Sequence, residues 1–125
     1  MLTIVRQNEL ALLAHTPLAL GTCLRHQFLA EIGETYGRSA AQVALRWLIQ
    51  QPQVGALAPA ADREHAEEYF DIFDFELSDQ DMQEIHALAR PDGRMVNPAR
   101  LAPDWGSQEG ANVPEDPDRE MADRI

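Results

Sequence analysis

Two short runs of consecutive apolar residues divide the first part of the chain, and each run ends close to a proline. The first run is Leu10–Ala14, followed by His15-Thr16-Pro17, and the second is Val54–Ala58, closed by Pro59. Proline lacks a backbone N–H, so a β-strand stops before it. Apolar character without alternation is typical of strands buried on both faces, as in parallel sheets. We therefore predict two parallel strands over these runs.

Between these runs, apolar residues recur at the spacing of an α-helix in two segments, which predicts two helices. The first segment places four side chains on one helical face: Phe28, Leu29, Ile32 and Tyr36. Gly37 follows directly, and glycine is the usual residue at the end of a helix. The second segment opens with Ser39 and Gln42 at the spacing of a capping box. Its shared apolar face consists of Val43, Ala44, Trp47 and Leu48.

Three more helices are predicted outside this region. One covers about Leu2–Asn8 at the start of the chain. Asp62 can cap a helix over about 63–70, whose first turn is mainly acidic, as the helix dipole favours. Ser78 and Asp81 open a last helix. The stripe that this last helix is expected to bury consists of Met82, Ile85, Leu88 and Ala89.

The predicted order of elements is α–β–α–α–β–α–α. A strand–helix–strand crossover between parallel strands belongs to the α/β class. Two strands alone do not make a stable buried sheet, so part of the expected sheet is missing from this chain.

Composition changes near residue 90. Residues 91–125 hold five of the eight prolines, and residues 104–125 carry seven acidic residues against two arginines. Such a segment buries too little apolar surface to offset the entropy of ordering it. We therefore expect a body over residues 1–105 and a disordered acidic tail over 106–125, with an interaction tail as the alternative.

The charge of the whole chain narrows the classes of partner. The net charge is −11 and all ten basic residues are arginines. An acidic surface repels phosphate backbones, so nucleic-acid binding is not expected. No apolar run approaches the ~20 residues of a membrane span, and no signal segment opens the chain. One cysteine cannot form an internal disulfide, which favours a reducing, cytoplasmic setting.

Four motifs, in the same order along the chain, resemble the aldo-keto reductase family, particularly its bacterial diketogluconate-reductase-like branch. Ala14-His15-Thr16-Pro17-Leu18, with Gly21 beyond it, resembles the family's A-Y-S-P-L…G segment. The segment 37–47 is similar to its T-P-A-Q-V-A-L-R-W helix, and 71–78 to its D-F-E-L-S stretch. Residues 93–98 and 101–105 resemble the R-L-V-x-P-x-x-L-A-P-x-W ending.

This resemblance implies the C-terminal portion of a (β/α)8 TIM barrel, a fold of about twice this length. Only two strands with their packing helices would be present, which accounts for the missing sheet. The family transfers a hydride from NADP(H) to an aldehyde or ketone, with an Asp, Tyr, Lys and His tetrad. The tetrad precedes the matching segment, and the chain contains no lysine. We therefore expect no catalytic residue here. No metal site is expected either, because His65, Glu68 and Tyr69 are followed by no further ligand of metal type, which favours a solvated helix face.

The resemblance implies a cofactor-binding role for several residues, because they stand at the positions that bind the cofactor in the family. His15 stands where the family places an aromatic residue that stacks on nicotinamide; the alternative is a loop histidine without a ligand. Thr16 replaces a serine that binds the pyrophosphate, since the chemistry needs only a hydroxyl donor; the alternative is a strand-end cap. Leu18 and Gly21 fit the same phosphate-straddling loop. These four residues are the first part of the expected cofactor site.

The second part of this site departs from the family pattern. The family's I-P-K-S stretch holds the 2′-phosphate, but Pro59 occupies its lysine position, Ala60 its serine position and His65 that of a later arginine. Glu68 keeps the glutamate that contacts adenine. Arg63 is the remaining candidate for the phosphate, at a helix start where the dipole also favours an anion. We therefore expect weak or absent NADP binding.

Three functions stay open at this point. The chain is part of an NADP-dependent oxidoreductase, acting on a small carbonyl substrate if another chain completes it. Alternatively it is a shortened, non-catalytic remnant, or an interaction module that assembles through exposed strands. Unpaired sheet edges and open apolar faces recruit further copies, so we expect a homo-oligomer.

Overall fold

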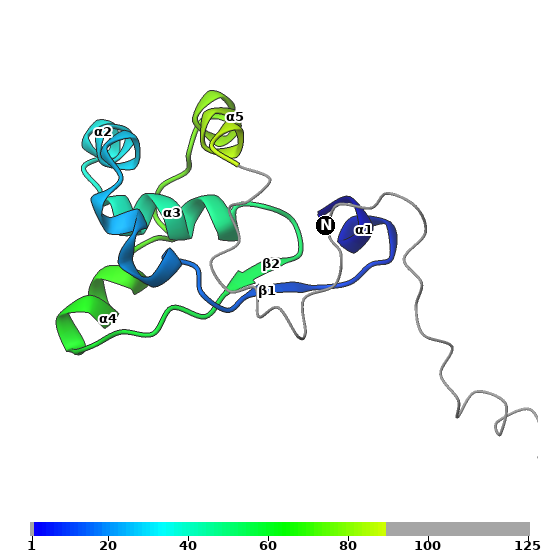
Figure 1. Cartoon of the computed structure of the whole chain (residues 1–125), viewed down its shortest axis with the longest axis horizontal. Helices are drawn as coiled ribbons and strands as arrows, with labels where there is room; N and C mark the ends of the chain where they lie inside the picture. The colour runs from blue at the N-terminus through cyan, green and yellow to red at the C-terminus, as the bar shows by residue number, and fades with distance from the viewer. Residues whose placement is uncertain (1, 90–125) are drawn as a thin grey trace, which may run out of the picture. The chain divides into compact units, whose positions relative to one another are not determined.

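The two apolar runs pair as parallel strands. In the computed structural model, which describes residues 2–89, β1 (Leu12–Ala14) lies beside β2 (Val54–Ala56) in parallel orientation, as Figure 1 shows. Leu13 faces Gly55 in this register. The predicted parallel pairing is confirmed, although each strand is shorter than its run. The expectation of burial on both faces is wrong, because Leu13 in β1 is 57% exposed and the three residues of β2 are only partly buried.

The helices follow the predicted order. In chain order the α-helices are α1 (Leu2–Gln7), α2 (Gln27–Tyr36), α3 (Ala40–Ile49), α4 (Arg63–Phe70) and α5 (Asp79–Ala87). Two short 3-10 helices, η1 (Ala19–Gly21) and η2 (Cys23–Arg25), lie between β1 and α2. These two turns were not predicted, since neither has a periodic apolar pattern.

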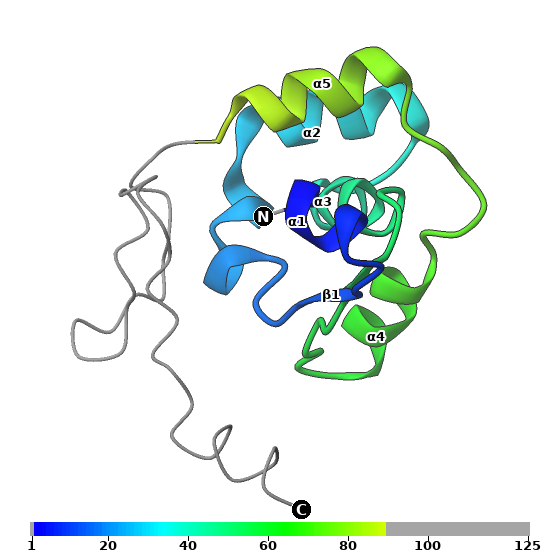
Figure 2. The same cartoon turned by 90° about the vertical axis from the view of Figure 1, so that its right-hand side faces the viewer.

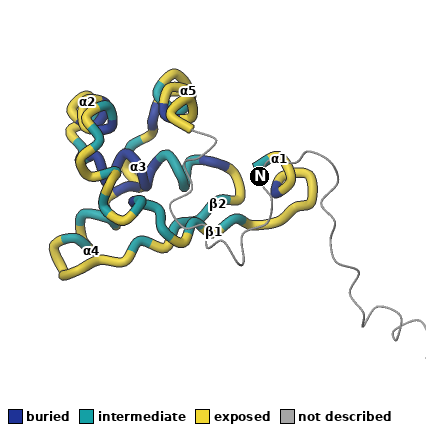
Figure 3. The backbone as a smooth tube through the Cα atoms, in the orientation of Figure 1, coloured by how far each residue is buried: buried dark blue, intermediate teal, exposed yellow. Residues whose placement is uncertain are grey.

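Helix α3 forms the centre of the described region. Ser39 and Gln42 form the predicted capping box: the Gln42 N–H donates to Ser39 Oγ at 3.2 Å, and the Ser39 N–H donates to Gln42 Oε1 at 3.0 Å. The helix contacts α2, β2, η2 and α4, and its first seven residues are buried (Figure 3). A helix that is apolar around most of its circumference is buried in this way. The buried core around it includes Leu18, Leu29, Ile32, Val43, Leu45, Ile72, Leu77 and Ile85.

Helix α5 lies beside α2, as Figures 1 and 2 show. Ser78 caps it by accepting from the Asp81 N–H at 3.1 Å, as predicted. Its buried stripe is narrower than predicted: Ile85 is buried, but Leu88 is 40% exposed and Ala89 is exposed. The helix ends at Ala87, so the last two positions of the predicted stripe lie beyond it.

The remaining sequence predictions fall on residues 90–125, outside the described residues. They are the boundary at residue 105, the acidic tail over 106–125 and the motif over 93–105. Across residues 2–89, every helix is too short or too polar to serve as a membrane span.

Candidate functional site

A small hollow opens where the two strands end. It has a volume of about 200 Å³ and receives residues from the loop after β1, from the loop after β2 and from α4. Its described lining residues are Thr16, Pro17, Leu18, Leu20, Gly21, Leu24, Pro59 and Tyr69. The carboxyl ends of parallel strands are the usual place for a binding site in α/β proteins. Pockets that enclose a drug-sized ligand measure about 300–1,000 Å³, so this hollow suits one ring or sugar of a larger ligand.

The loop after β1 reaches the hollow through a left-handed turn. Ala19, Leu20 and Gly21 have φ values of 49°, 54° and 85°. Glycine adopts this conformation freely, whereas residues with a side chain do so at a cost of about 1 kcal/mol or more. Leu20 is also 74% exposed. Strained backbone of this kind is concentrated at ligand-binding loops, and the sequence pattern gave no sign of it.

Among the described lining residues, Thr16 and Tyr69 have polar side chains, and each offers a hydroxyl group. Thr16 Oγ1 lies 3.3 Å from His15 Nδ1. The Tyr69 phenol has its pKa raised, first by burial and then by the nearby carboxylates of Glu68 and Asp62. It is therefore uncharged at neutral pH and can donate a hydrogen bond. The described part of the lining offers two hydroxyl donors to a group with hydrogen-bond acceptors, and it contains no cationic side chain.

The structure brings together three of the six residues expected to bind a cofactor. Thr16, Leu18 and Gly21 line the hollow. His15 follows β1 directly and is exposed, outside the described lining.

The two residues expected from α4 lie elsewhere. Arg63 is 90% exposed and its Nε donates to Glu67 Oε1 at 2.7 Å. Glu68 Oε1 accepts from Ser39 Oγ at 2.5 Å. Neither belongs to the described lining of the hollow, and their proposed contacts with a ligand stay predictions.

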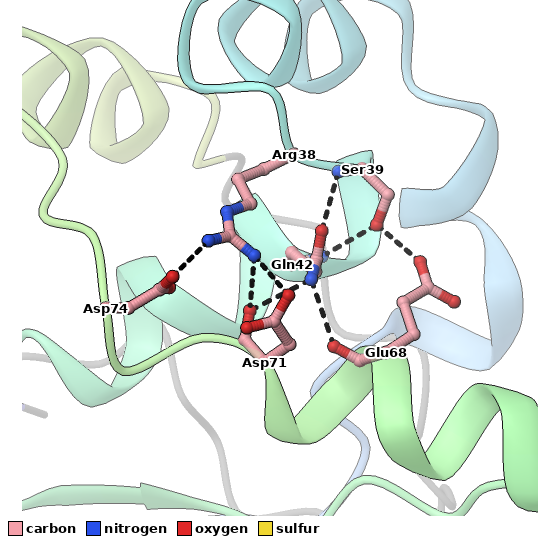
Figure 4. Close-up of polar contacts among 6 residues, drawn as sticks. All are labelled: Arg38, Ser39, Gln42, Glu68, Asp71 and Asp74. Carbon is pink, nitrogen blue, oxygen red and sulfur yellow. Dashed lines mark hydrogen bonds and ion pairs between the residues drawn. The ribbon is translucent and has the colours of Figure 1, made fainter.

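A polar network holds the C-terminal end of α4 against the start of α3 (Figure 4). The Gln42 side-chain amide donates to the backbone carbonyls of Glu68 at 3.1 Å and Asp71 at 2.9 Å. The Arg38 guanidinium pairs with the carboxylates of Asp71 and Asp74. Desolvation opposes the charge of Arg38, but hydrogen bonds to the two carboxylates outweigh it and raise the Arg38 pKa. This network fixes the turn of α4 that carries Tyr69.

This network was not predicted from the sequence, although both of its segments belong to motifs of the resemblance. The helix motif contains Arg38, Ser39 and Gln42, and the D-F-E-L-S stretch begins with Asp74. Their pairing across about 30 positions depends on the tertiary packing of α4 on α3, which local patterns do not show. Among residues 2–89, no group of three or more His, Cys, Asp or Glu side chains is arranged to hold a metal ion.

Comparison with known proteins gives consistent matches. A family model described as "Aldo/keto reductase family" matches residues 1–90. The chain is 39% identical over 98 residues to an aldo-keto reductase of Mycolicibacterium paratuberculosis, covering 78% of this chain and 32% of that protein. It is 42% identical over 89 residues to the glyoxal reductase of Bacillus subtilis, covering 70% of this chain and 32% of that protein.

Solved structures agree. A crystal structure provisionally assigned as 2,5-diketo-D-gluconic acid reductase B matches with a TM-score of 0.81 and 42% identity, over 85% of this chain and 38% of that chain. A variant of Gox0644 in complex with NADPH matches with a TM-score of 0.73 and 28% identity, over 81% of this chain and 37% of that chain. The present chain spans about a third of the length of the curated relatives it matches.

Proposed function

This chain belongs to the aldo/keto reductase family, and we propose that it forms part of the nicotinamide-dinucleotide site of an oxidoreductase that acts on aldehydes or ketones. The relative from Bacillus subtilis is a glyoxal reductase, and the Gox0644 structure contains NADPH. The observation that carries the proposal is the hollow at the carboxyl ends of β1 and β2 with Thr16 in its lining. The family resemblance implies cofactor binding on this loop, which supports the proposal.

The chemistry of the lining fits part of such a cofactor. The Thr16 hydroxyl would donate to a phosphate oxygen, and the Tyr69 phenol offers a second neutral donor. Leu18 and Pro17 provide apolar contact for a ring or a ribose face. When bound, the cofactor supplies the hydride for carbonyl reduction. These residues of the chain bind and orient the cofactor.

Residues 1–125 alone are not expected to catalyse carbonyl reduction. A tyrosine that donates a proton to a carbonyl needs a lowered pKa, usually from a nearby cation. The chain has no lysine. Tyr69 has a raised pKa, which disfavours proton donation. The Tyr36 hydroxyl already donates to Asp81 Oδ2 at 2.5 Å, so it is not available to a carbonyl. Reduction of a small carbonyl compound would require residues from outside this segment.

A fluorescence titration of the 125-residue chain with NADPH tests the proposal. We expect saturable binding with a Kd above 1 μM, because the missing lysine contact corresponds to roughly 1.5–3 kcal/mol, or about ten- to a hundredfold in affinity. Thr16→Val should weaken this binding about tenfold or more, because the lost hydrogen bond is one to a charged phosphate oxygen. Thr22→Val is the matched control, since Thr22 is exposed and lies outside the described lining of the hollow.

Two results would contradict the proposal. Equal weakening by the Thr16 and Thr22 variants would place the ligand elsewhere. Clear reduction of a simple aldehyde by the purified chain, lost in Tyr36→Phe or Tyr69→Phe, would show that these residues do catalyse.

One observation favours a second function, that of an interaction module. Leu13 on β1 and Leu57 after β2 are 57% and 50% exposed. Apolar side chains beside a short sheet are typical of surfaces that bind another chain. This function is compatible with weak cofactor binding, and its test is the oligomeric state.

A further inference from the structure

The cations and donors at the start of α4 are already bound to carboxylates of the same segment. Asp62 Oδ1 accepts from the His65 N–H at 2.9 Å and lies 2.7 Å from His65 Nδ1. The Arg63 Nε donates to Glu67 Oε1 at 2.7 Å. The Arg63 side chain is 90% exposed, so a phosphate that approached this turn would reach its guanidinium only beside the carboxylate of Glu67.

The surrounding charge also opposes an anion. Residues 62–68 contain four carboxylates against a single arginine, with His65 as a titratable group. Asp62 is the main cause of the raised His65 pKa, with smaller contributions from Glu68 and Glu64. Even when His65 is protonated, the segment keeps an excess of negative charge. At physiological ionic strength this field extends about 8 Å, because exposed charges are screened over that distance.

This acidic turn is connected with the hollow. The rings of His65 and Tyr69 lie in an edge-on contact with centroids 6.0 Å apart, and Tyr69 lines the hollow. Pro59, from the loop that leads toward α4, lines it too. In the proposed site, a dinucleotide end that left the hollow along α4 would meet Asp62 and His65. A bound 2′-phosphate does not fit this donor set.

We infer that this chain does not select the 2′-phosphate of NADPH and binds NADH at least as tightly. The inference rests on the proposed dinucleotide site and concerns its specificity. In dinucleotide-binding proteins generally, a carboxylate near the ribose accompanies binding of NAD, whereas an arginine accommodates the phosphate of NADP. Here Asp62 is the residue that sets the preference, since its carboxylate accepts from the His65 backbone N–H and lies within hydrogen-bond distance of His65 Nδ1.

Parallel titrations of the full chain with NADH and NADPH, at pH 7.5 and low salt, test this inference. We expect a Kd for NADPH equal to or above that for NADH. Asp62→Asn should tighten NADPH about two- to fivefold, the range for one exposed charge, and change NADH less than twofold. Asparagine caps a helix as well as aspartate does, so the variant keeps its fold, which circular dichroism would verify.

Asp79→Asn is the matched control, because it removes the same charge from the exposed first turn of α5. It should leave both affinities unchanged. NADPH binding tenfold tighter than NADH in the unmodified chain would overturn the inference while leaving the proposed function in place. An Asp62→Asn effect equal to that of Asp79→Asn would also overturn it. Absence of binding for both nucleotides at millimolar concentration would overturn the proposed function, and the inference with it.

Discussion

Ser39 Oγ donates a hydrogen bond to Glu68 Oε1 at 2.5 Å, which joins the N-cap of α3 to α4. The same hydroxyl accepts from the Gln42 N–H, so a single serine caps one helix and holds the next. Tyr69, which follows Glu68, lines the hollow. Glu68 therefore has a structural role in this chain. The contact with adenine that the resemblance implies for it stays a prediction.

Replacement of Glu68 by alanine should lower the free energy of unfolding by about 1–2 kcal/mol, because the bond from Ser39 to a charged acceptor is lost. Urea denaturation measures this loss. Glu64→Ala is the control on the same helix, and as an exposed substitution it should change stability by less than about 0.5 kcal/mol. Equal effects of the two variants would show that the Ser39–Glu68 bond does not stabilise the fold.

Tyr36 connects α2 with α5 in a similar way. Its hydroxyl donates to Asp81 Oδ2 at 2.5 Å and accepts from the Ser78 N–H at 3.0 Å. Hydrogen bonds from the Ser78 hydroxyl and then from Tyr36 hold the pKa of Asp81 below its usual value. A depressed carboxyl pKa contributes stability that is present above the unfolded pKa of about 3.9 and is lost as the pH falls through the folded pKa.

We therefore expect Tyr36→Phe to cost about 1 kcal/mol at pH 7 and progressively less below about pH 4. Denaturation curves at several pH values between 3 and 7 measure this difference. Tyr69→Phe is the control, since a phenol with a raised pKa does not titrate in this range. The unmodified chain and Tyr36→Phe differ in free energy of unfolding. If this difference stays constant with pH, the titration of Asp81 is not linked to the Tyr36 hydrogen bond.

The left-handed turn at the hollow predicts two substitutions with opposite effects on stability. Leu20 has φ 54° and ψ 35°, so Leu20→Gly relieves backbone strain. The gain is about 1 kcal/mol or less, because glycine also gains entropy in the unfolded chain. Leu24 lines the same hollow in η2 and is not among the left-handed residues. Leu24→Gly should therefore destabilise the fold by about 1 kcal/mol.

Thermal melts of the two glycine variants give the comparison. Both remove apolar surface from the hollow, so both should also weaken binding of a dinucleotide. A lower melting temperature for Leu20→Gly than for Leu24→Gly would contradict the strain at Leu20.

Sequence patterns correctly predicted the features that depend only on residues close together in the chain. The caps at Ser39, Asp62 and Ser78, and the end of α2 at Gly37 with φ 65°, depend on residues within about four positions. The parallel pairing of the strands could also be predicted, because two continuous apolar runs joined through helices are typical of parallel strands in one sheet. Each of these predictions is confirmed in the structure.

Features set by tertiary packing could not be predicted in this way. The Arg38 ion pairs and the Ser39–Glu68 bond require α4 to lie on α3. The ion pair between Arg63 and Glu67 has an ordinary i,i+4 spacing, whereas the resemblance implied a phosphate role for Arg63. The prediction that this segment is the last part of a barrel also stays open, since the matches cover only about a third of the curated relatives.

The exposed strand region leads to a prediction about assembly. Within residues 2–89, β1 and β2 pair only with each other, so each leaves one edge without a strand partner. Leu10, Leu13 and Leu57 are each at least half exposed nearby. Burial of a leucine side chain provides about 1.5–3 kcal/mol, so two copies that cover these leucines gain several kcal/mol. The net charge of −11 opposes association and should limit the size of the assembly.

Light scattering at micromolar concentration should therefore detect a dimer or larger species. The double substitution Leu13→Gln and Leu57→Gln should shift it toward monomer, because the edge loses the apolar surface that association covers. Leu88→Gln is the control, as it replaces an exposed leucine just beyond α5 rather than beside the strands. A monomer that unfolds cooperatively would contradict this prediction, because β1 and β2 would then be stable without a second copy packed against them. An equal shift toward monomer in the Leu88 variant would instead mean that association depends on exposed apolar side chains in general. Only an effect confined to the leucines beside β1 and β2 supports association through the strands.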